Sequence, residues 1–126
     1  CQRIIDEAQP QWHVIENPAG GLIRQFLGKP DYAYEPWQYG SPWTKRTGLW
    51  GNFNTPPPNY SEWGGLAKML IYARPGRRPS LAFLHKSAFK LIPEFRDSGM
   101  PEPTTDAELR SLCSQGFAHA FKAVNQ

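Results

Sequence analysis

The stretch Trp12-His13-Val14-Ile15-Glu16-Asn17-Pro18 decides the expected fold class of this chain. Residues 12–15 are rich in strand formers, and Pro18 is expected to end the strand, because the residue before a proline avoids helical backbone angles. Upstream, residues 2–8 have helical spacing and stop before Pro10. A helix that leads into a short buried strand is the repeating unit of an α/β sheet, so we predict an α/β fold.

Downstream of this stretch, the pattern continues with a short helix and a second strand. A turn at residues 19–21 leads into residues 22–27, which have helical spacing. The aromatic segment 31–42 is expected to be irregular. Residues 44–53 have the composition of a second strand, which ends before the prolines that begin at Pro56.

The rest of the chain is expected to be rich in loops and to end in two helices. The 13 prolines and 11 glycines favour turns. Residues 80–95 have roughly helical spacing, although Pro93 limits that element. Thr105 and Glu108 form a capping-box pattern for one helix, and a second helix follows Gly116. Its apolar face would consist of Phe117, Ala118, Phe121 and Val124.

Length and composition indicate one globular domain of 126 residues, with 40% apolar and 20% charged residues. No apolar run is long enough to cross a bilayer and no charged-then-apolar leader opens the chain, so we expect a soluble, cytoplasmic protein without membrane contact. Two cysteines cannot form a disulfide scaffold, which fits a reducing compartment. Because the chain starts at Cys1 rather than at methionine, we expect a fragment or a processed piece.

The net charge of +3 is unevenly distributed. No acidic residue occurs between Glu62 and Glu94, whereas six basic residues do. They are Lys68, Arg74, Arg77, Arg78, Lys86 and Lys90. Such a block is typical of a surface that meets phosphates, and we expect Arg74, Arg77 and Arg78 to contact DNA. A solvated basic face is the alternative.

The triplet from Glu16 to Pro18 is the best candidate for chemistry. A carboxylate at the C-terminal end of a buried strand points into the crevice where α/β sheets bind their ligands. The alternative is an ordinary turn with a solvated glutamate.

Several short motifs occur in a fixed order along the chain, and together they indicate a protein family more specifically than the triplet alone. They are residues 14–18 (VIENP), Leu22, Arg24, residues 29–31 (KPD), 36–40 (PWQYG), 45–50 (KRTGLW), 110–113 (RSLC) and 116–118 (GFA). This combination resembles phage and prophage cytosine-C5 DNA methyltransferases. The similarity covers about residues 12–53 and 105–125, and the middle of the chain is unmatched.

The resemblance implies the C-terminal part of a Rossmann-like methyltransferase sheet and a defined role for Glu16. In that family the target cytosine is flipped out of DNA into a pocket. A cysteine thiolate attacks C6, the acid of the Glu-Asn motif holds and protonates N3, and S-adenosylmethionine supplies the methyl group for C5. Glu16 would be that acid, and burial would help it to keep its proton. Asn17 would brace the loop by hydrogen bonding.

The resemblance also implies that Lys45, Arg46 and Thr47 bind the DNA substrate. Lys45 and Thr47 lie where the family has an alternating basic pair on a strand that lines the base pocket, although the family usually has arginines there. Arg46 would point to the opposite face of the strand. The alternative is that Lys45 and Arg46 are exposed charges of a strand or turn.

The cofactor half of the family's site is absent from this chain. The family's nucleophile directly follows a proline upstream of the Glu-Asn motif, which neither Cys1 nor Cys113 does, so both are expected to be small packing residues. No glycine-rich loop that would cradle a cofactor is present. We therefore expect that this chain alone neither binds S-adenosylmethionine nor turns over. The histidines show no metal-ligand spacing, so no metal site is expected.

These observations divide the chain into three expected regions. Residues 1–53 would be the C-terminal half of a catalytic α/β domain, residues 54–104 a loop-rich, basic target-recognition region, and residues 105–126 helices that pack on the catalytic domain. The function hypothesis is the C-terminal portion of a DNA (cytosine-5-)-methyltransferase of a phage or its bacterial host, with DNA and an N-terminal cofactor-binding half as partners. The alternatives are a non-catalytic nucleic-acid-binding module of the same fold and a phage structural or interaction protein.

Overall fold

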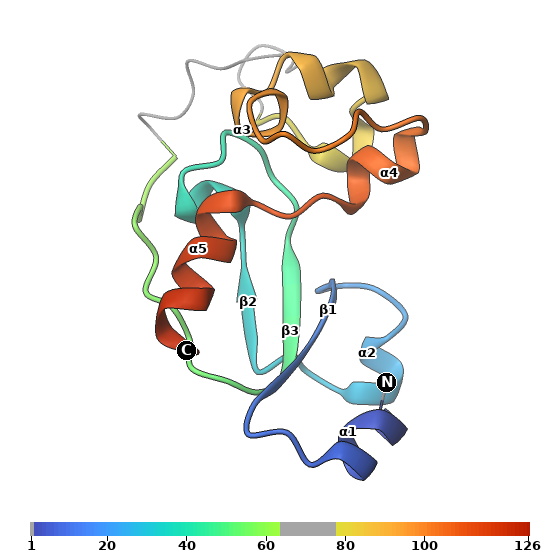
Figure 1. The fold of residues 1–126 in the computed structure, drawn as a ribbon, viewed down its shortest axis with the longest axis vertical. Helices are drawn as coiled ribbons and strands as arrows, with labels where there is room; N and C mark the ends of the chain where they lie inside the picture. Colours follow the sequence, from blue (N-terminus) through green and yellow to red (C-terminus); the bar gives the residue numbers. More distant parts are fainter. Residues whose placement is uncertain (1, 64–77) are drawn as a thin grey trace.

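A three-stranded antiparallel sheet forms the centre of the computed structural model, which describes residues 2–63 and 78–126 (Figure 1). The strands are β1 (His13–Pro18), β2 (Tyr32–Tyr34) and β3 (Thr47–Asn52), in the order β1-β3-β2. Both pairs are antiparallel. The predicted mixture of helices and strands is therefore confirmed, but these three strands do not form the parallel helix-strand repeat that the opening stretch suggested.

Strand β1 ends at Pro18, as predicted, but it includes the Asn17-Pro18 step, so the expectation that Glu16 lies at the end of the strand is wrong. Glu16 pairs with Leu49 in the middle of the ladder, and Pro18 pairs with Thr47. A proline is tolerated here because β1 has a strand neighbour on one side only in the described part of the chain, and an edge position can do without the missing N–H. The extended backbone that proline favours at Asn17 also suits a strand.

The aromatic segment 31–42 is more regular than expected. It contains β2 and a short 3-10 helix, η1 (Pro36–Tyr39), whose start is held by a hydrogen bond from the Glu35 amide to Gln38 Oε1 at 2.7 Å. Gly40, at a φ of 96°, ends it. The sequence concealed β2 because a strand of three residues is too short for an alternating pattern, and its pairing with β3 forms over a long sequence separation.

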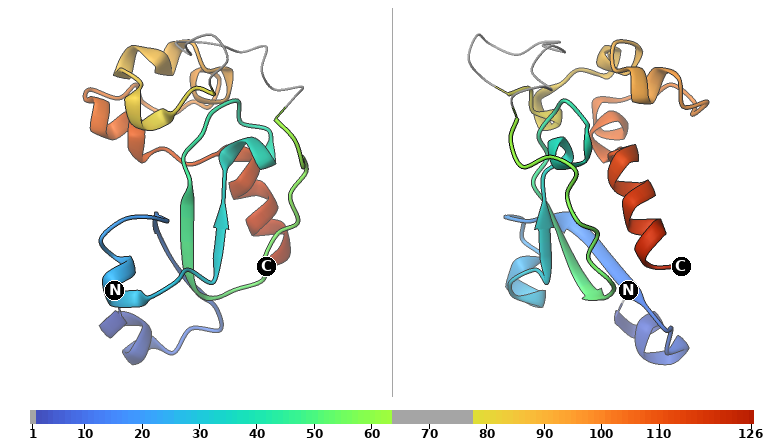
Figure 2. Two further views of the ribbon diagram at one scale, coloured as in Figure 1. Left: turned by 180° about the vertical axis from the view of Figure 1, so that it is seen from behind. Right: turned by 90° about the vertical axis from the view of Figure 1, so that its left-hand side faces the viewer.

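The two faces of the sheet are covered by different segments (Figure 2). Helix α5 (Gln115–Val124) packs on one face, where the rings of Phe117 and Tyr34 stack with their centroids 3.7 Å apart. Helix α2 (Arg24–Leu27) and the loops around it lie on the other face, where the indole of Trp50 donates to the Gly28 carbonyl at 3.0 Å. The face under α5 is the one that matters for the candidate site.

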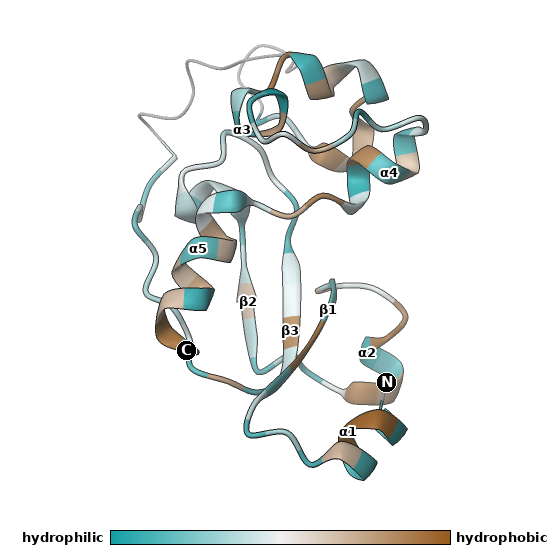
Figure 3. Ribbon diagram, viewed as in Figure 1, coloured by the Kyte–Doolittle hydropathy of each residue, from teal (hydrophilic) through white to brown (hydrophobic). Residues whose placement is uncertain are grey.

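Helix α1 (Gln2–Ala8) and helix α2 display apolar side chains outside the core. Ile4 is 68% exposed and Phe26 is 84% exposed. Figure 3 shows the corresponding apolar bands on both helices. In the described residues these two helices therefore add little to the buried core.

A second apolar cluster lies above the sheet and is built from short elements. These are η3 (Leu81–Phe83), η4 (Lys86–Lys90), α3 (Pro93–Arg96) and α4 (Asp106–Ser111). Its buried members are Trp43, Leu81, Leu84, Ala88, Phe89, Ile92, Phe95 and Leu109. The expected helical element at 80–95 is thus divided into three pieces, and Pro93 begins the last of them instead of limiting a longer helix, because proline suits the first helical turn.

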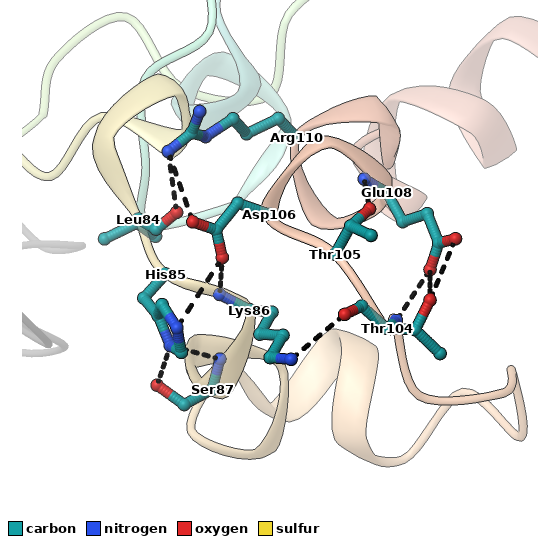
Figure 4. Close-up of polar contacts among 9 residues, drawn as sticks. All are labelled: Leu84, His85, Lys86, Ser87, Thr104, Thr105, Asp106, Glu108 and Arg110. Atoms are coloured by element: carbon teal, nitrogen blue, oxygen red, sulfur yellow. Dashed lines mark hydrogen bonds and ion pairs between the residues drawn. The ribbon is translucent and has the colours of Figure 1, made fainter.

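Helix α4 begins with the cap that the sequence predicted (Figure 4). Thr105 Oγ1 accepts from the Glu108 amide at 3.2 Å, while the Glu108 carboxylate accepts from the Thr104 amide instead of the Thr105 amide. Asp106 accepts from the Lys86 amide at 2.8 Å and so ties α4 to η4. The capping box is confirmed with its reciprocal bond shifted by one residue.

Glu94 joins this second cluster to the start of α5. Its carboxylate accepts from the Trp43 indole at 2.7 Å, from the Ser41 hydroxyl at 3.0 Å and from the Gln115 amide at 3.2 Å. It thereby holds α3, the 41–43 loop and the start of α5 together.

No helix within residues 2–63 and 78–126 has the length and apolar character needed to span a membrane.

Candidate functional site

A cavity of about 600 Å³ lies between the sheet and α5. Side chains of β1, β2 and β3 form one wall, because Val14, Glu16 and Leu49 project from the same face of the ladder. The apolar lining residues are Trp12, Val14, Tyr34, Leu49, Phe117, Ala118 and Phe121, and the polar ones are Glu16, Ser111, Cys113, Lys122, Asn125 and Gln126. A mainly apolar, aromatic cavity of this size with a few polar groups is typical of a small-molecule site.

Glu16 supplies the carboxylate of this cavity. It comes from the middle of β1, and its carboxylate has neither an ion-pair nor a hydrogen-bond partner among the described residues. Its side chain is exposed, so the expectation that burial would help it to keep its proton is wrong. Antiparallel pairing explains this, since the edge strand β1 leaves one flank of Glu16 uncovered. The carboxylate is available to a ligand.

Asn17 does not brace the Glu16 loop as expected. It is the next residue of β1 and therefore projects from the opposite face of the sheet. Its side chain makes no hydrogen bond within the described part of the chain. The brace is provided by backbone bonds, including the one from the Ala19 amide to the Arg46 carbonyl at 3.1 Å.

Tyr34 and Cys113 place two neutral polar groups beside Glu16. The Tyr34 hydroxyl lies 3.8 Å from Cys113 Sγ. Desolvation by burial, strengthened by the neighbouring thiol, raises the pKa of Tyr34 far above its ordinary value. Cys113 is exposed at the mouth of the cavity, yet desolvation raises the pKa of its thiol, and the nearby Glu16 carboxylate adds to this effect. Both groups therefore keep their protons at neutral pH.

The raised pKa of Cys113 makes it a poor nucleophile at neutral pH, because the thiolate is the reactive form. We expect iodoacetamide to alkylate Cys113 several-fold more slowly at pH 7 than it alkylates a cysteine in a short peptide. The rate should continue to rise at a pH where the peptide thiol is already fully ionised. Mass spectrometry of a Cys1→Ser variant measures this rate, and a pH profile that coincides with that of the peptide would contradict the assignment.

Lys45 and Thr47 do not line this cavity. Lys45 is half-buried and its ammonium donates to the Leu112 carbonyl at 3.2 Å. Thr47 is buried, and its hydroxyl donates to the Lys45 carbonyl at 2.7 Å. Both side chains thus have structural partners, and a role for them in contacting DNA stays a prediction.

The expected basic contacts are separated in space. Arg46 is exposed and lines a different cavity that faces α2. The guanidinium of Arg78 lies over the rings of Trp37 and Trp63, at 5.0 and 5.1 Å from their centroids. Arg74 and Arg77 lie outside the described residues. Among the residues that the structure describes, none of the predicted basic contacts lines the Glu16 cavity.

Sequence reasoning missed most of the polar lining of the cavity. Cys113 was assigned to packing, while Tyr34, Lys122 and Asn125 were not singled out. They come from β2 and from the last helix and its end, far from Glu16 in the chain. Asn125 is buried and binds both the amide and the carbonyl of Asn54. The one useful signal was the helical spacing of Phe117 and Phe121, which correctly predicted the inward face of α5.

Comparisons with protein-family models, with curated proteins and with solved structures found no match to this chain. Within the described ranges, no group of three or more histidine, cysteine, aspartate or glutamate residues is placed to hold a metal ion. A function is therefore argued from the cavity and from the charges around it.

Proposed function

We propose that the cavity between the sheet and α5 receives a cytosine extruded from DNA, and that the chain is the C-terminal portion of a DNA (cytosine-5-)-methyltransferase. The observation that carries this proposal is the Glu16 carboxylate, which lacks a partner among the described residues and lines a cavity of about 600 Å³ with aromatic walls. A flipped base stacks between apolar and aromatic side chains and is recognised by hydrogen bonds to its Watson–Crick edge. Trp12 and Phe121, which line the cavity and are less buried than Tyr34 and Phe117, would supply the stacking surface.

Glu16 would act on the base edge in its protonated form. The carboxyl O–H would donate to N3 of cytosine, while its carbonyl oxygen would accept from the exocyclic amino group. Bound cytosine would displace water from the exposed flank of Glu16, and this desolvation favours the protonated form of a carboxyl. Proton transfer to N3 would prevent negative charge from building up when a nucleophile adds to the ring.

The nucleophile and the cofactor site are assigned to an N-terminal half. Cys113 faces the same cavity, but the raised pKa of its thiol argues against its acting as the nucleophile. The described residues do not fit S-adenosylmethionine, because Glu16 is the only acidic residue in the cavity and the base requires it.

The open edge of β1 supports the association with such a half. In the described residues β1 pairs only with β3, and the exposed apolar residues Ile4, Leu22 and Phe26 lie on the segments that flank it in sequence. In the proposed complete enzyme, strands of the N-terminal half would extend the sheet from this edge into a Rossmann-like sheet, and would cover these residues.

A non-catalytic nucleic-acid-binding module is the second candidate. The poor nucleophilicity of Cys113 and the cluster of cations on the other side of the sheet favour it. Both candidates predict binding of an unpaired cytosine, and they differ in whether a full-length protein transfers methyl groups.

The proposal is tested with DNA duplexes that contain one mismatched cytosine or one mismatched thymine at the same place. We expect the chain to prefer the cytosine duplex by about tenfold, the scale of one well-formed neutral hydrogen bond. Glu16→Ala should abolish this preference and leave binding of the thymine duplex unchanged. Glu16→Gln should preserve it, because an amide offers the same donor and acceptor as a protonated carboxyl. Fluorescence anisotropy measures the affinities of the unmodified chain and of both variants for each duplex.

Two further measurements complete this test. Glu102→Gln, which changes an exposed glutamate outside the cavity, is the matched control and should behave like the unmodified chain. In a full-length active enzyme, Glu16→Gln should remove most methylation, because an amide cannot transfer a proton to N3. An unchanged cytosine preference in Glu16→Ala would show that the cavity does not recognise the base.

A further inference from the structure

A second cavity, of about 430 Å³, lies on the side of the sheet opposite α5. Its walls come from the Ala19-Gly20 turn, Arg24 of α2, residues 29–33 and Arg46. Arg24 and Lys29 were not among the expected site residues, and Arg46 was expected to point away from the base pocket. The fold brings these three cations to one hollow.

Acidic side chains balance the charge of this hollow only in part: Asp31 is in its lining, and the Glu35 carboxylate interacts electrostatically with Arg46 without forming an ion pair. None of Arg24, Lys29 and Arg46 has an ion pair or a side-chain hydrogen bond within the described residues. Asp31 is the one acidic residue of the lining, and its Oδ2 accepts from the Gly51 amide at 2.8 Å, so that carboxylate is partly satisfied by β3. By contrast, Lys90, Arg96 and Arg110 each lie within 4.0 Å of a carboxylate.

Backbone hydrogen bonds hold the walls of the hollow in place. The Ala19 amide donates to the Arg46 carbonyl at 3.1 Å, and the Gly21 amide donates to the Pro18 carbonyl at 2.9 Å. On the other wall, the Asp31 amide donates to the Leu49 carbonyl at 2.9 Å. A preformed concave site that concentrates positive charge is suited to an anion, and arginine suits the paired oxygens of a phosphate.

The hollow is close to Glu16 along the chain. Only two residues separate Glu16 from Ala19, so their Cα atoms are at most about 11 Å apart. Glu16 lines one cavity and Ala19 lines the other. A nucleic-acid strand that passes around the end of β1 could therefore place a base in the first cavity and a neighbouring phosphate in the second.

We propose that the hollow lined by Arg24, Lys29 and Arg46 binds a phosphate group of a nucleic-acid backbone, next to the nucleotide whose base enters the Glu16 cavity. The statement that the neighbouring nucleotide places its base in the Glu16 cavity rests on the proposed function. The phosphate site itself rests on three cations that have no ion pair among the described residues and on the hydrogen-bonded walls around them. Backbone phosphates fix the register of a bound strand without reading its sequence.

The experiment uses a fluorescent oligothymidylate, which contains no cytosine, titrated at several salt concentrations. We expect the triple variant Arg24→Gln, Lys29→Gln, Arg46→Gln to bind at least about tenfold more weakly at low salt. The slope of log K against log salt should fall by about two, because each lost contact with a single strand removes about 0.7. Arg46→Gln alone should lower the slope by about 0.7, so the test does not depend on the triple variant being folded.

The matched control is Lys90→Gln, Arg96→Gln, Arg110→Gln, which removes the same types and number of charges from cations that have carboxylate partners. If this control lowered the slope of log K against log salt as much as the first triple variant does, the effect would come from net charge in general, and the proposal would be overturned. Unchanged oligothymidylate binding in the first triple variant would overturn it as well. If that variant instead lost binding of inorganic phosphate in calorimetry, the hollow would be a site for free phosphate and not for a strand.

The outcome is separable from that of the proposed function. Glu16→Ala should leave oligothymidylate binding unchanged, because no cytosine is present. If Glu16→Ala lost the cytosine preference while the charge variants kept the salt slope of the unmodified chain, only the base cavity would be supported. If the charge variants lowered the salt slope while Glu16→Ala kept the cytosine preference, only the phosphate site would be supported.

Discussion

Gly116→Ala should lower the free energy of unfolding by about 3 kcal/mol or more, in the upper range of the cost of overpacking. A Cβ atom at this position would overlap the backbone carbonyl oxygen of Tyr39. A flexible side chain could move aside, but this oxygen belongs to the end of η1 and cannot move without shifting that turn. Alanine normally favours a helix over glycine by about 1 kcal/mol, and here the overlap should outweigh that gain.

Thermal unfolding followed by circular dichroism measures this effect, and a fall in Tm on the order of 10 °C is expected for a domain of this size. Gly20→Ala is the matched control, because a Cβ atom there would meet nothing within 4 Å. Its Tm should stay within a few degrees of that of the unmodified chain. If the two variants had equal stability, α5 would not pack on η1 as closely as described, and the wall of the Glu16 cavity would be misplaced.

Phe95→Ala should lower the free energy of unfolding by about 3–5 kcal/mol, as deletion of a buried aromatic side chain generally does. Phe95 is fully buried in the cluster above the sheet. Its ring lies 5.6 Å from the ring of Trp43 and 6.1 Å from that of Phe89, measured between centroids. The neighbouring Glu94 holds this cluster to α5, so the loss should also reach the sheet.

Phe83→Ala provides the same chemical change in the same region at a side chain that is 87% exposed. Its effect should be within about 0.5 kcal/mol of zero, as for most surface substitutions. Urea unfolding of both variants measures the difference. Equal effects would mean that residues 79–112 do not form the second apolar cluster.

The two cavities suggest how one short sheet could serve one ligand from both sides. The Glu16 cavity is mainly apolar, with protonated Tyr34 and Cys113 near the carboxylate, and it suits a flat ring with a polar edge. The hollow beside Arg46 carries three cations that have no ion pair among the described residues, and it suits an anion. A nucleotide has both parts, which is why the proposed base site and the proposed phosphate site support each other without depending on the same residues.

Local signals in the sequence correctly predicted several elements. The helix at residues 2–8, the strand that starts near His13 and the cap at Thr105 were confirmed, and the last helix was also found, although it begins at Gln115 and not after Gly116. Each of these signals depends on residues within one or two helical turns or along one strand. The predictions that failed involved the pairing and surroundings of elements, namely the parallel sheet, the position of Glu16 at the end of β1 and the burial of Glu16.

What the sequence by itself determined is the mixed α/β class, most element positions and the choice of Glu16 as a residue of interest, because periodicity, capping and turn chemistry act over short distances along the chain. Only the tertiary structure decided that β1 and β3 are antiparallel, that Cys113 and Tyr34 face Glu16, and that Arg24, Lys29 and Arg46 share a hollow. These features arise when segments far apart in the chain pack together. Pairing direction, desolvation and the balance of charges all depend on those long-range neighbours, which no local pattern specifies.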